Sequence, residues 1–227
     1  MADERLFTKE ELAEMGKMTV EAIQEAIDKG DGEKAKKLSR RMYREFLAMH
    51  DLYLHFTTGL LSYVGRQHGD EALYQALYGA VGAFMRPLVE AYRGIEPRRR
   101  AEMLAAGLRG HLHPLKVEED DEKFTFMMQP CASGGRLILE GAYEGPPNKF
   151  LKVEKAQEMT FGRSDHPVYC VHCAFQEIVP IDWEGVPPFI TEPSPNLGKE
   201  PCRIYIYKRP EDIPARFYER FGKQKPA

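Results

Sequence analysis

The sequence lacks a run of about 20 consecutive apolar residues, the length that a transmembrane helix needs. It opens on the acidic and polar stretch Met-Ala-Asp-Glu-Arg, which does not resemble a secretory signal. An excess of positive charge is also missing, since the formal net charge is -3 and the pI is near 6.2. We therefore expect a cytoplasmic protein that has neither a membrane nor a nucleic acid as its partner.

Motifs for nucleotide binding are missing as well. The loop of residues 133–136 (Ser-Gly-Gly-Arg) has neither the lysine and spacing of a P-loop nor the glycine pattern of dinucleotide-binding folds. Its two glycines are expected to let the backbone pass close to a cysteine site or a substrate. We assign Arg136 to an anionic group of the substrate.

The first 110 or so residues predict four or five helices. Thr8 and Glu11 have the spacing of a capping box, and the stretch of residues 30–32 ends a first helix or helix pair. A long helix is expected from about residue 33 to 67. Two neighbouring rows of apolar residues run along it, so the helix should be central and largely buried. The first row recurs at alternating steps of four and three: Met42, Phe46, Met49, Tyr53, Phe56, Leu60 and Tyr63.

Helices continue after a break at Gly69. Small residues at positions 79–83, Gly82 among them, should let a neighbouring helix approach closely, and Pro87 should kink or restart the helix. Another helix is expected from Pro97, which suits a first helical turn, to about residue 110. The positive run of residues 98–100 then belongs to a solvated helix start.

The character of the sequence changes at His111. Residues 123–128, 136–140 and 202–207 are rich in strand formers and should pair in one antiparallel sheet, and residues 210–221 suggest a closing helix. Gly- and Pro-rich loops join these segments. The predicted fold is α+β: an N-terminal helical bundle (residues 1–110) packs on a C-terminal antiparallel β-sheet (residues 111–227), as two layers of one compact unit.

Four cysteines in a reducing compartment indicate free thiols or metal ligands rather than disulfides. Cys131 follows the expected strand of residues 123–128, and two further cysteines and a histidine stand within residues 170–173. A two-residue gap between cysteines lets both thiolates reach one metal ion. We therefore predict a metal site with these ligands: Cys131, Cys170, His172 and Cys173.

Alternatives to this ligand set remain open. His166, His113 or His111 can take the place of His172, and Cys202 can join the cluster. Zinc suits a mixture of thiolate and imidazole best, while iron or an iron–sulfur cluster also accepts thiolates. Without a metal, the cysteines would form a catalytic or redox thiol pair, or would pack in the core.

Glu177 is the predicted proton carrier. If residues 174–178 form helical turns, Glu177 lies on the helix face of Cys173, four positions earlier. A carboxylate there can act as general base toward a metal-bound water, whose pKa zinc lowers to about 7. Three protein ligands with Glu177 would indicate an enzyme, and four protein ligands a structural site. A solvated glutamate on a helix surface is the simpler interpretation.

One family shares this order of features. After a helical first half, a strand ends in Cys131, and a second cysteine motif follows about forty residues later. Over roughly the last hundred residues this outline resembles the L-2-amino-thiazoline-4-carboxylate hydrolase-like family, and the resemblance implies hydrolysis of a small molecule. The second motif of that family has a cysteine followed by an acidic residue, whereas this chain has Cys170-Val171-His172-Cys173.

Two functions from different classes follow. The first is a metal-dependent hydrolase or lyase, with zinc, that acts on a small polar molecule; Glu177 moves protons and Arg136 meets an anion. The second is a non-enzymatic protein in which a closed metal site stabilises the loops while the helical half binds a small ligand or a partner. The broad apolar surface of the long helix can be covered within one chain or across a homodimer.

Overall fold

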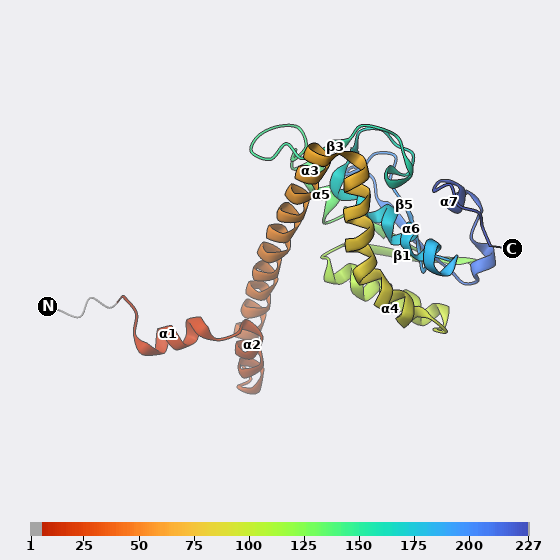
Figure 1. The fold of residues 1–227 in the computed structure, drawn as a ribbon. Helices are drawn as coiled ribbons and strands as arrows, with labels where there is room; N and C mark the ends of the chain where they lie inside the picture. The colour runs from red at the N-terminus through yellow and green to blue at the C-terminus, as the bar shows by residue number, and fades with distance from the viewer. Residues whose placement is uncertain (1–5, 227) are drawn as a thin grey trace. The chain divides into compact units, whose positions relative to one another are not determined.

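The computed structural model describes residues 6–226, and the pentapeptide that we compared with secretory signals lies outside this range. The chain divides into two compact units, Met1–Tyr53 and Leu54–Ala227. This division does not follow the expected boundary at residue 110, because residues 54–110 belong to the same unit as the β-rich half. No helix within residues 6–226 is long and apolar enough to cross a membrane. Helices and a sheet of four antiparallel strands confirm the α+β fold class (Figure 1).

The first unit contains α1 (Lys9–Gly16), α2 (Thr19–Asp28) and the beginning of α3 (Gly32–Tyr92). The predicted capping box is present at α1: the hydroxyl of Thr8 accepts the N–H of Glu11, and the Glu11 carboxylate accepts the N–H of Thr8. The first residue of α2, Thr19, donates its hydroxyl to Glu45 of α3 at 2.7 Å. The expected pair of helices before residue 30 is therefore confirmed.

Helix α3 contains the expected break, because Gly69 has a φ of 81° and a ψ of -179° that no helix can hold. The helix runs on through Pro87 to Tyr92, so this proline does not restart it. In the second unit the row of Leu54 and Thr58 is buried, and the Thr58 hydroxyl bonds the Leu54 carbonyl at 2.6 Å. This row anchors its part of the helix in the core.

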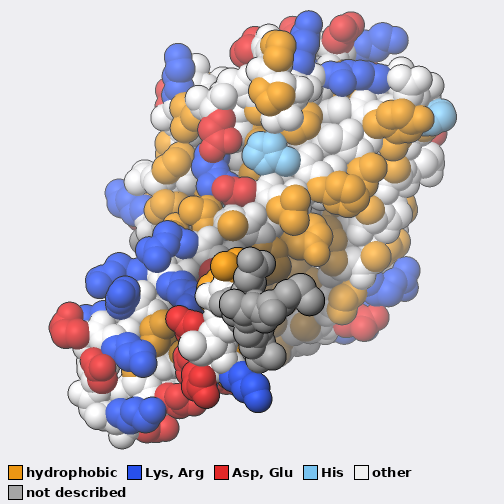
Figure 2. All heavy atoms as spheres, turned by 90° about the vertical axis from the view of Figure 1, so that its left-hand side faces the viewer, with side chains coloured by type: hydrophobic (Ala, Val, Ile, Leu, Met, Phe, Trp, Pro, Cys, Tyr) orange, Lys and Arg blue, Asp and Glu red, His pale blue; other side chains and the backbone are white. Residues whose placement is uncertain are grey.

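The prediction of a largely buried long helix was wrong for the first apolar row. All its members are exposed, from 38% for Phe46 to 61% for Tyr53. Figure 2 shows hydrophobic side chains exposed on the face of the molecule that it draws. A helical period establishes that one face is apolar, but it does not establish which surface covers that face.

The main sheet has the strand order β1 (Leu115–Glu119), β2 (Lys123–Met128), β6 (Cys202–Tyr207) and β5 (Ile190–Glu192). The two predicted strands β2 and β6 lie side by side in its centre, with Met128 opposite Cys202. The edge strands β1 and β5 were not predicted. They are short, and four of the five residues of β1 are exposed, so they carry little of the alternating pattern that identifies a half-buried strand.

Residues 136–140 are not the strand that we predicted, because Gly134–Leu139 forms the short helix α5. Apolar runs of this length do not distinguish strand from buried helix. Leu137 of α5 is fully buried, and its surroundings rather than its propensity decide the conformation.

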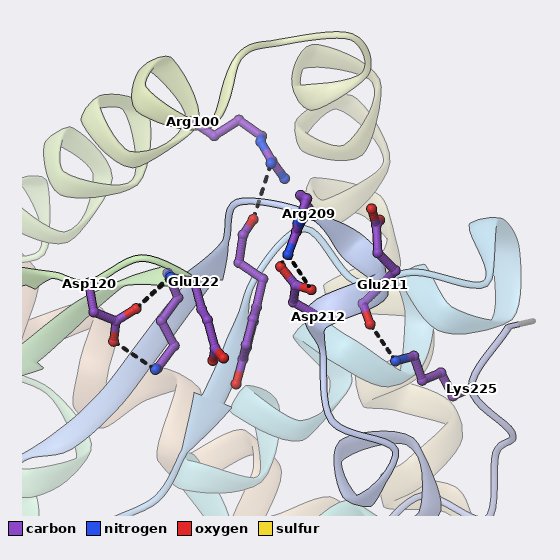
Figure 3. A network of polar contacts seen from close by, with 9 residues as sticks. Arg100, Asp120, Glu122, Arg209, Glu211, Asp212 and Lys225 are labelled. Carbon is purple, nitrogen blue, oxygen red and sulfur yellow. Dashed lines mark hydrogen bonds and ion pairs between the residues drawn. The ribbon is translucent and has the colours of Figure 1, made fainter.

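Helix α4 (Pro97–Gly110) has the predicted bounds and is tied to the sheet. Arg98 and Arg99 are solvated as expected, but Arg100 donates to the carbonyl of Tyr207 at the end of β6, at 3.3 Å (Figure 3). Asp120 shapes the neighbouring β1–β2 turn by accepting two backbone N–H groups, those of Glu122 and Lys123.

The helix α6 (His172–Glu184) passes through the core of the second unit and follows the 3-10 turn Val168–Val171. Trp183 of α6 packs against α3 where Gly82 leaves room; a β-carbon at Gly82 would lie 3.4 Å from the indole, which confirms the predicted close approach. The small sheet of β3 (Lys152–Val153) and β4 (His166–Pro167) precedes this turn.

The predicted closing helix is shorter than expected. It consists of the 3-10 turn Pro210–Asp212 and of α7 (Arg216–Glu219), whose Phe217 is buried.

Candidate functional site

All four cysteines of the chain line one partly enclosed cavity of about 120 Å³ in the second unit. Each of them is a free thiol. The sequence separates Cys131 from Cys202 by seventy-one positions, yet the structure brings both to the same cavity wall. Four histidines share this wall with the cysteines: His111, His113, His166 and His172.

The sheet and α6 together bring the cysteines to the cavity. Cys202 begins β6 opposite the last residue of β2, and Cys131 follows the end of β2 by three positions. Cys170 lies in the 3-10 turn and Cys173 in the first turn of α6. The 3-10 turn and the first turn of α6 therefore bring Cys170, His172 and Cys173 to the same cavity wall.

Two glycines make room for this cluster, as the sequence predicted. A β-carbon at Gly134 would lie 2.6 Å from the sulfur of Cys170, and one at Gly135 would lie 3.0 Å from the β-carbon of Cys131. Real β-carbons essentially never come within 3.0 Å of another heavy atom. Only a residue without a side chain therefore fits at Gly134.

The thiols are neutral in this structure because burial raises the pKa of each of them. The pKa of Cys173 rises to about 12 and that of Cys202 to about 11, and those of Cys131 and Cys170 also rise. After burial, negative charge on Glu177 raises the pKa of Cys173 further. Backbone N–H groups oppose the effect of burial on the pKa at two of the thiols: those of residues 133–135 at Cys131 and that of Ser194 at Cys202.

His172 has the orientation that suits a metal ligand. Its Nδ1 lies 2.5 Å from the carbonyl oxygen of Tyr169, so that Nδ1 carries the proton and donates it. Its Nε2 then presents a lone pair, 3.7 Å from the sulfur of Cys173. Histidines that bind metals usually donate their other ring N–H to a carbonyl or carboxylate in this way. Burial lowers the pKa of His172, which keeps the ring neutral.

His113 and His166 are also oriented by the backbone. Nδ1 of His113 accepts the N–H of Ala132 at 2.9 Å, so a neutral His113 carries its proton on Nε2. Burial lowers the pKa of His166 to about 4, with a further lowering by Arg163. His166 is therefore a neutral imidazole at physiological pH.

The carboxylate of Glu177 lies in the core, and Glu177 is not among the residues that line the cavity. One oxygen accepts the N–H of Thr191 at 2.7 Å, and the other lies 2.5 Å from the guanidinium of Arg220. Burial raises the pKa of Glu177 to about 7 although Arg220 and the Thr191 N–H both lower it. The simpler interpretation, a solvated glutamate, was wrong, because none of this side chain is exposed.

Arg136, the predicted anion-binding residue, also lies outside the cavity lining. Its guanidinium pairs with Glu140 on the same side of α5, with 3.6 Å between Nε and the carboxylate. The roles of Glu177 and Arg136 in catalysis stay predictions.

Sequence reasoning missed several polar residues of the cavity wall, among them Gln176, Thr191 and Glu200. Thr191 belongs to the unpredicted strand β5, and no local motif marks any of the three. The place of Thr191 at the site follows from the long-range pairing of β5 with β6.

The types of side chain around the cavity fit a thiophilic metal ion. Four thiols and an imidazole that is oriented by a carbonyl match the ligands that zinc prefers. Among residues 6–226, however, no three or more His, Cys, Asp or Glu side chains are arranged so as to hold a metal ion. The donor atoms are gathered, but they do not converge on one point.

No family model, curated protein or solved structure matches the chain.

Proposed function

We propose that this protein is a metal-dependent hydrolase or lyase, with zinc as its metal, that acts on a small polar molecule in the cysteine-lined cavity, in the cytoplasm. One observation carries the proposal: every cysteine of the chain lines the same cavity, beside a histidine oriented as metal-bound histidines are. Cys131, Cys170, Cys173 and His172 would hold the ion, with Cys202 as a further donor. Iron is the alternative metal.

A bound zinc ion supplies a Lewis acid and a water of lowered pKa. The chain itself supplies two neutral imidazoles in the cavity wall, those of His166 and His172. Nδ1 of His113 accepts the N–H of Ala132, and this bond orients the ring in the cavity wall. Glu177 has no part in this scheme, because Thr191 and Arg220 engage both of its carboxylate oxygens.

The same engagement of Glu177 favours a second candidate, a non-enzymatic protein that binds a small ligand beside a metal that stabilises the loops. Neither predicted catalytic side chain lines the cavity. X-ray absorption spectroscopy of the metal-loaded protein separates the two candidates. Three protein ligands and one bound water support the enzyme. Four protein ligands around the ion support the second candidate.

Metal content per chain, measured on protein purified without added metal, tests the proposal. The wild type should carry near one equivalent of zinc, and a Cys170→Ser, Cys173→Ser double variant should lose it. Glu177→Gln is the matched control, since it perturbs the core beside Cys173 without removing a thiol. Absence of metal from the wild type would overturn the proposal, and so would a double variant that keeps its metal.

We also propose that a second copy of the chain covers the apolar row of α3. Its alternating steps of four and three are those of a coiled-coil seam. Seven large side chains, about half exposed, offer on the order of 700 Å² per chain, close to the roughly 800 Å² that a stable interface buries on each partner. The seam would join two parallel or antiparallel α3 helices.

A further inference from the structure

Two buried polar atoms in the cavity wall have no hydrogen-bond partner within residues 6–226: Nε2 of His166 and Oγ1 of Thr191. Only 2% of His166 and 3% of Thr191 are exposed. A buried polar atom without a partner costs about 1–3 kcal/mol, and native proteins keep few of them. Two such atoms in one cavity indicate a group that enters from outside the chain.

The other side of the His166 ring is fixed. β4 pairs His166 with Val153, and the imidazole donates to the backbone carbonyl of Cys170, a bond that raises the pKa of the ring. Because Nε2 has no partner, this bond falls on Nδ1. A neutral imidazole that donates from Nδ1 carries its proton there and has a lone pair on Nε2. Nε2 of His166 is therefore a hydrogen-bond acceptor without a partner within residues 6–226.

The backbone of Thr191 is fixed in the same way. Its N–H donates to Glu177 at 2.7 Å, and its carbonyl accepts from Arg220 at 2.9 Å. These bonds hold the middle residue of β5 in place while its hydroxyl remains unpaired. A hydroxyl both donates and accepts, so Thr191 can meet either kind of polar atom on a ligand.

The charge and size of the cavity restrict the ligand. Among the described residues that line it there is no lysine or arginine, and Glu200 is the one carboxylate. A carboxylate ligand would therefore find no side-chain cation, and burial of an unpaired charge is costly. The volume of about 120 Å³ is somewhat below the roughly 150 Å³ of a cavity that accepts benzene. These limits favour a small uncharged molecule.

We propose that His166 and Thr191 form a subsite for the amide-like group of a small uncharged molecule. The N–H of that group donates to Nε2 of His166, and its carbonyl oxygen accepts from the hydroxyl of Thr191. The inference rests on the proposed function in one respect, that the cavity takes a small polar ligand. It does not require the metal.

Three probes of nearly equal shape test this subsite: acetamide, acetate and acetamidinium. Each is titrated into the full-length protein as purified, and the dissociation constant is read from the chemical shift of the Thr191 amide. Acetamide should bind more tightly than acetate, which has no N–H for His166 and carries an unpaired charge, and more tightly than acetamidinium, which has no oxygen to accept from Thr191. Failure of acetamide to saturate the shift, or equal binding of acetamide and acetamidinium, would overturn the inference.

Two substitutions test the assignment to residues. Thr191→Val removes the hydroxyl and keeps the shape, and His166→Asn keeps a donor for the Cys170 carbonyl and removes Nε2. Each should weaken acetamide binding about tenfold, the effect of one hydrogen bond. The matched control is Thr58→Val, which removes a buried hydroxyl away from the cavity and should leave acetamide binding unchanged.

Metal content of the same proteins separates this inference from the proposed function. Selective loss of acetamide binding in the Thr191 and His166 variants supports the subsite even if no protein carries metal. Unchanged acetamide binding in both variants overturns the subsite even if the wild type carries one zinc.

Discussion

A β-carbon added at Gly134 would lie 2.6 Å from the sulfur of Cys170. The two residues are thirty-six positions apart in the chain, and α5 meets the 3-10 turn of residues 168–171 at this point. The neighbouring sulfur belongs to a short side chain that is itself enclosed, so it has little room to move away. The start of α5 and the cysteine cluster are therefore one packed unit.

Gly134→Ala should destabilise the protein by about 1–3 kcal/mol, the usual cost of overpacking a core, and should lower its metal content. Gly107→Ala in α4 is the matched control, because nothing lies within 4 Å of its added β-carbon and alanine is favoured over glycine in a helix by about 1 kcal/mol. Urea unfolding of the two variants checks this. Equal stability of both would contradict the close approach at Gly134.

Glu177→Gln should lower the free energy of unfolding by about 3 kcal/mol, because it leaves the charge of Arg220 without its partner in a largely buried place. Glutamine still accepts the Thr191 N–H, so the loss reports the ion pair. The exposed Glu102→Gln, which breaks pairs with Arg98 and Arg99, should change stability by less than about 1 kcal/mol. Chemical denaturation of both variants provides the comparison, and a Glu177 variant as stable as wild type would refute a structural role.

Acid should destabilise the metal-free protein through His166. The pKa of this ring falls from 6.5 to about 4 on folding, chiefly through burial. Below pH 6.5 the unfolded chain therefore binds a proton that the folded chain refuses, and stability decreases as the pH falls from 6.5 to 4. The loss is at most about 3.5 kcal/mol, at roughly 1.4 kcal/mol per pH unit. The urea midpoint of wild type should fall more steeply over this range than that of His166→Asn, and parallel slopes would contradict the prediction.

Charge placed on the apolar row of α3 should separate the proposed homodimer. Light scattering should give the wild type twice the 26.0 kDa mass of one chain. The Phe56→Lys, Leu60→Lys double variant should be a folded monomer, because both side chains are exposed in the single chain. Arg44→Ala, at an exposed position outside the row, should remain a dimer. A monomeric wild type would exclude a second copy as the cover of this surface.

Local patterns predicted those parts of the fold in which neighbouring residues suffice. The capping box at Thr8, the helix from Pro97 to Gly110 and the strands of residues 123–128 and 202–207 appear as expected. Each of these segments has caps, breaks or alternation that act within a few residues. The run of residues 136–140 and the strands β1 and β5 lack such signals, and they were misassigned or missed.

The sequence by itself determined the α+β class, the four thiols, and the glycines that must lie where backbone comes close to them. Only the tertiary structure decided that Cys202 joins the other three cysteines, that Glu177 turns to Arg220, and that His166 and Thr191 share one cavity wall. The spacing of residues along the chain determines the directions of their side chains only within one or two turns of the same element. Contacts between distant segments depend instead on how strands pair and how helices pack, which no local pattern encodes.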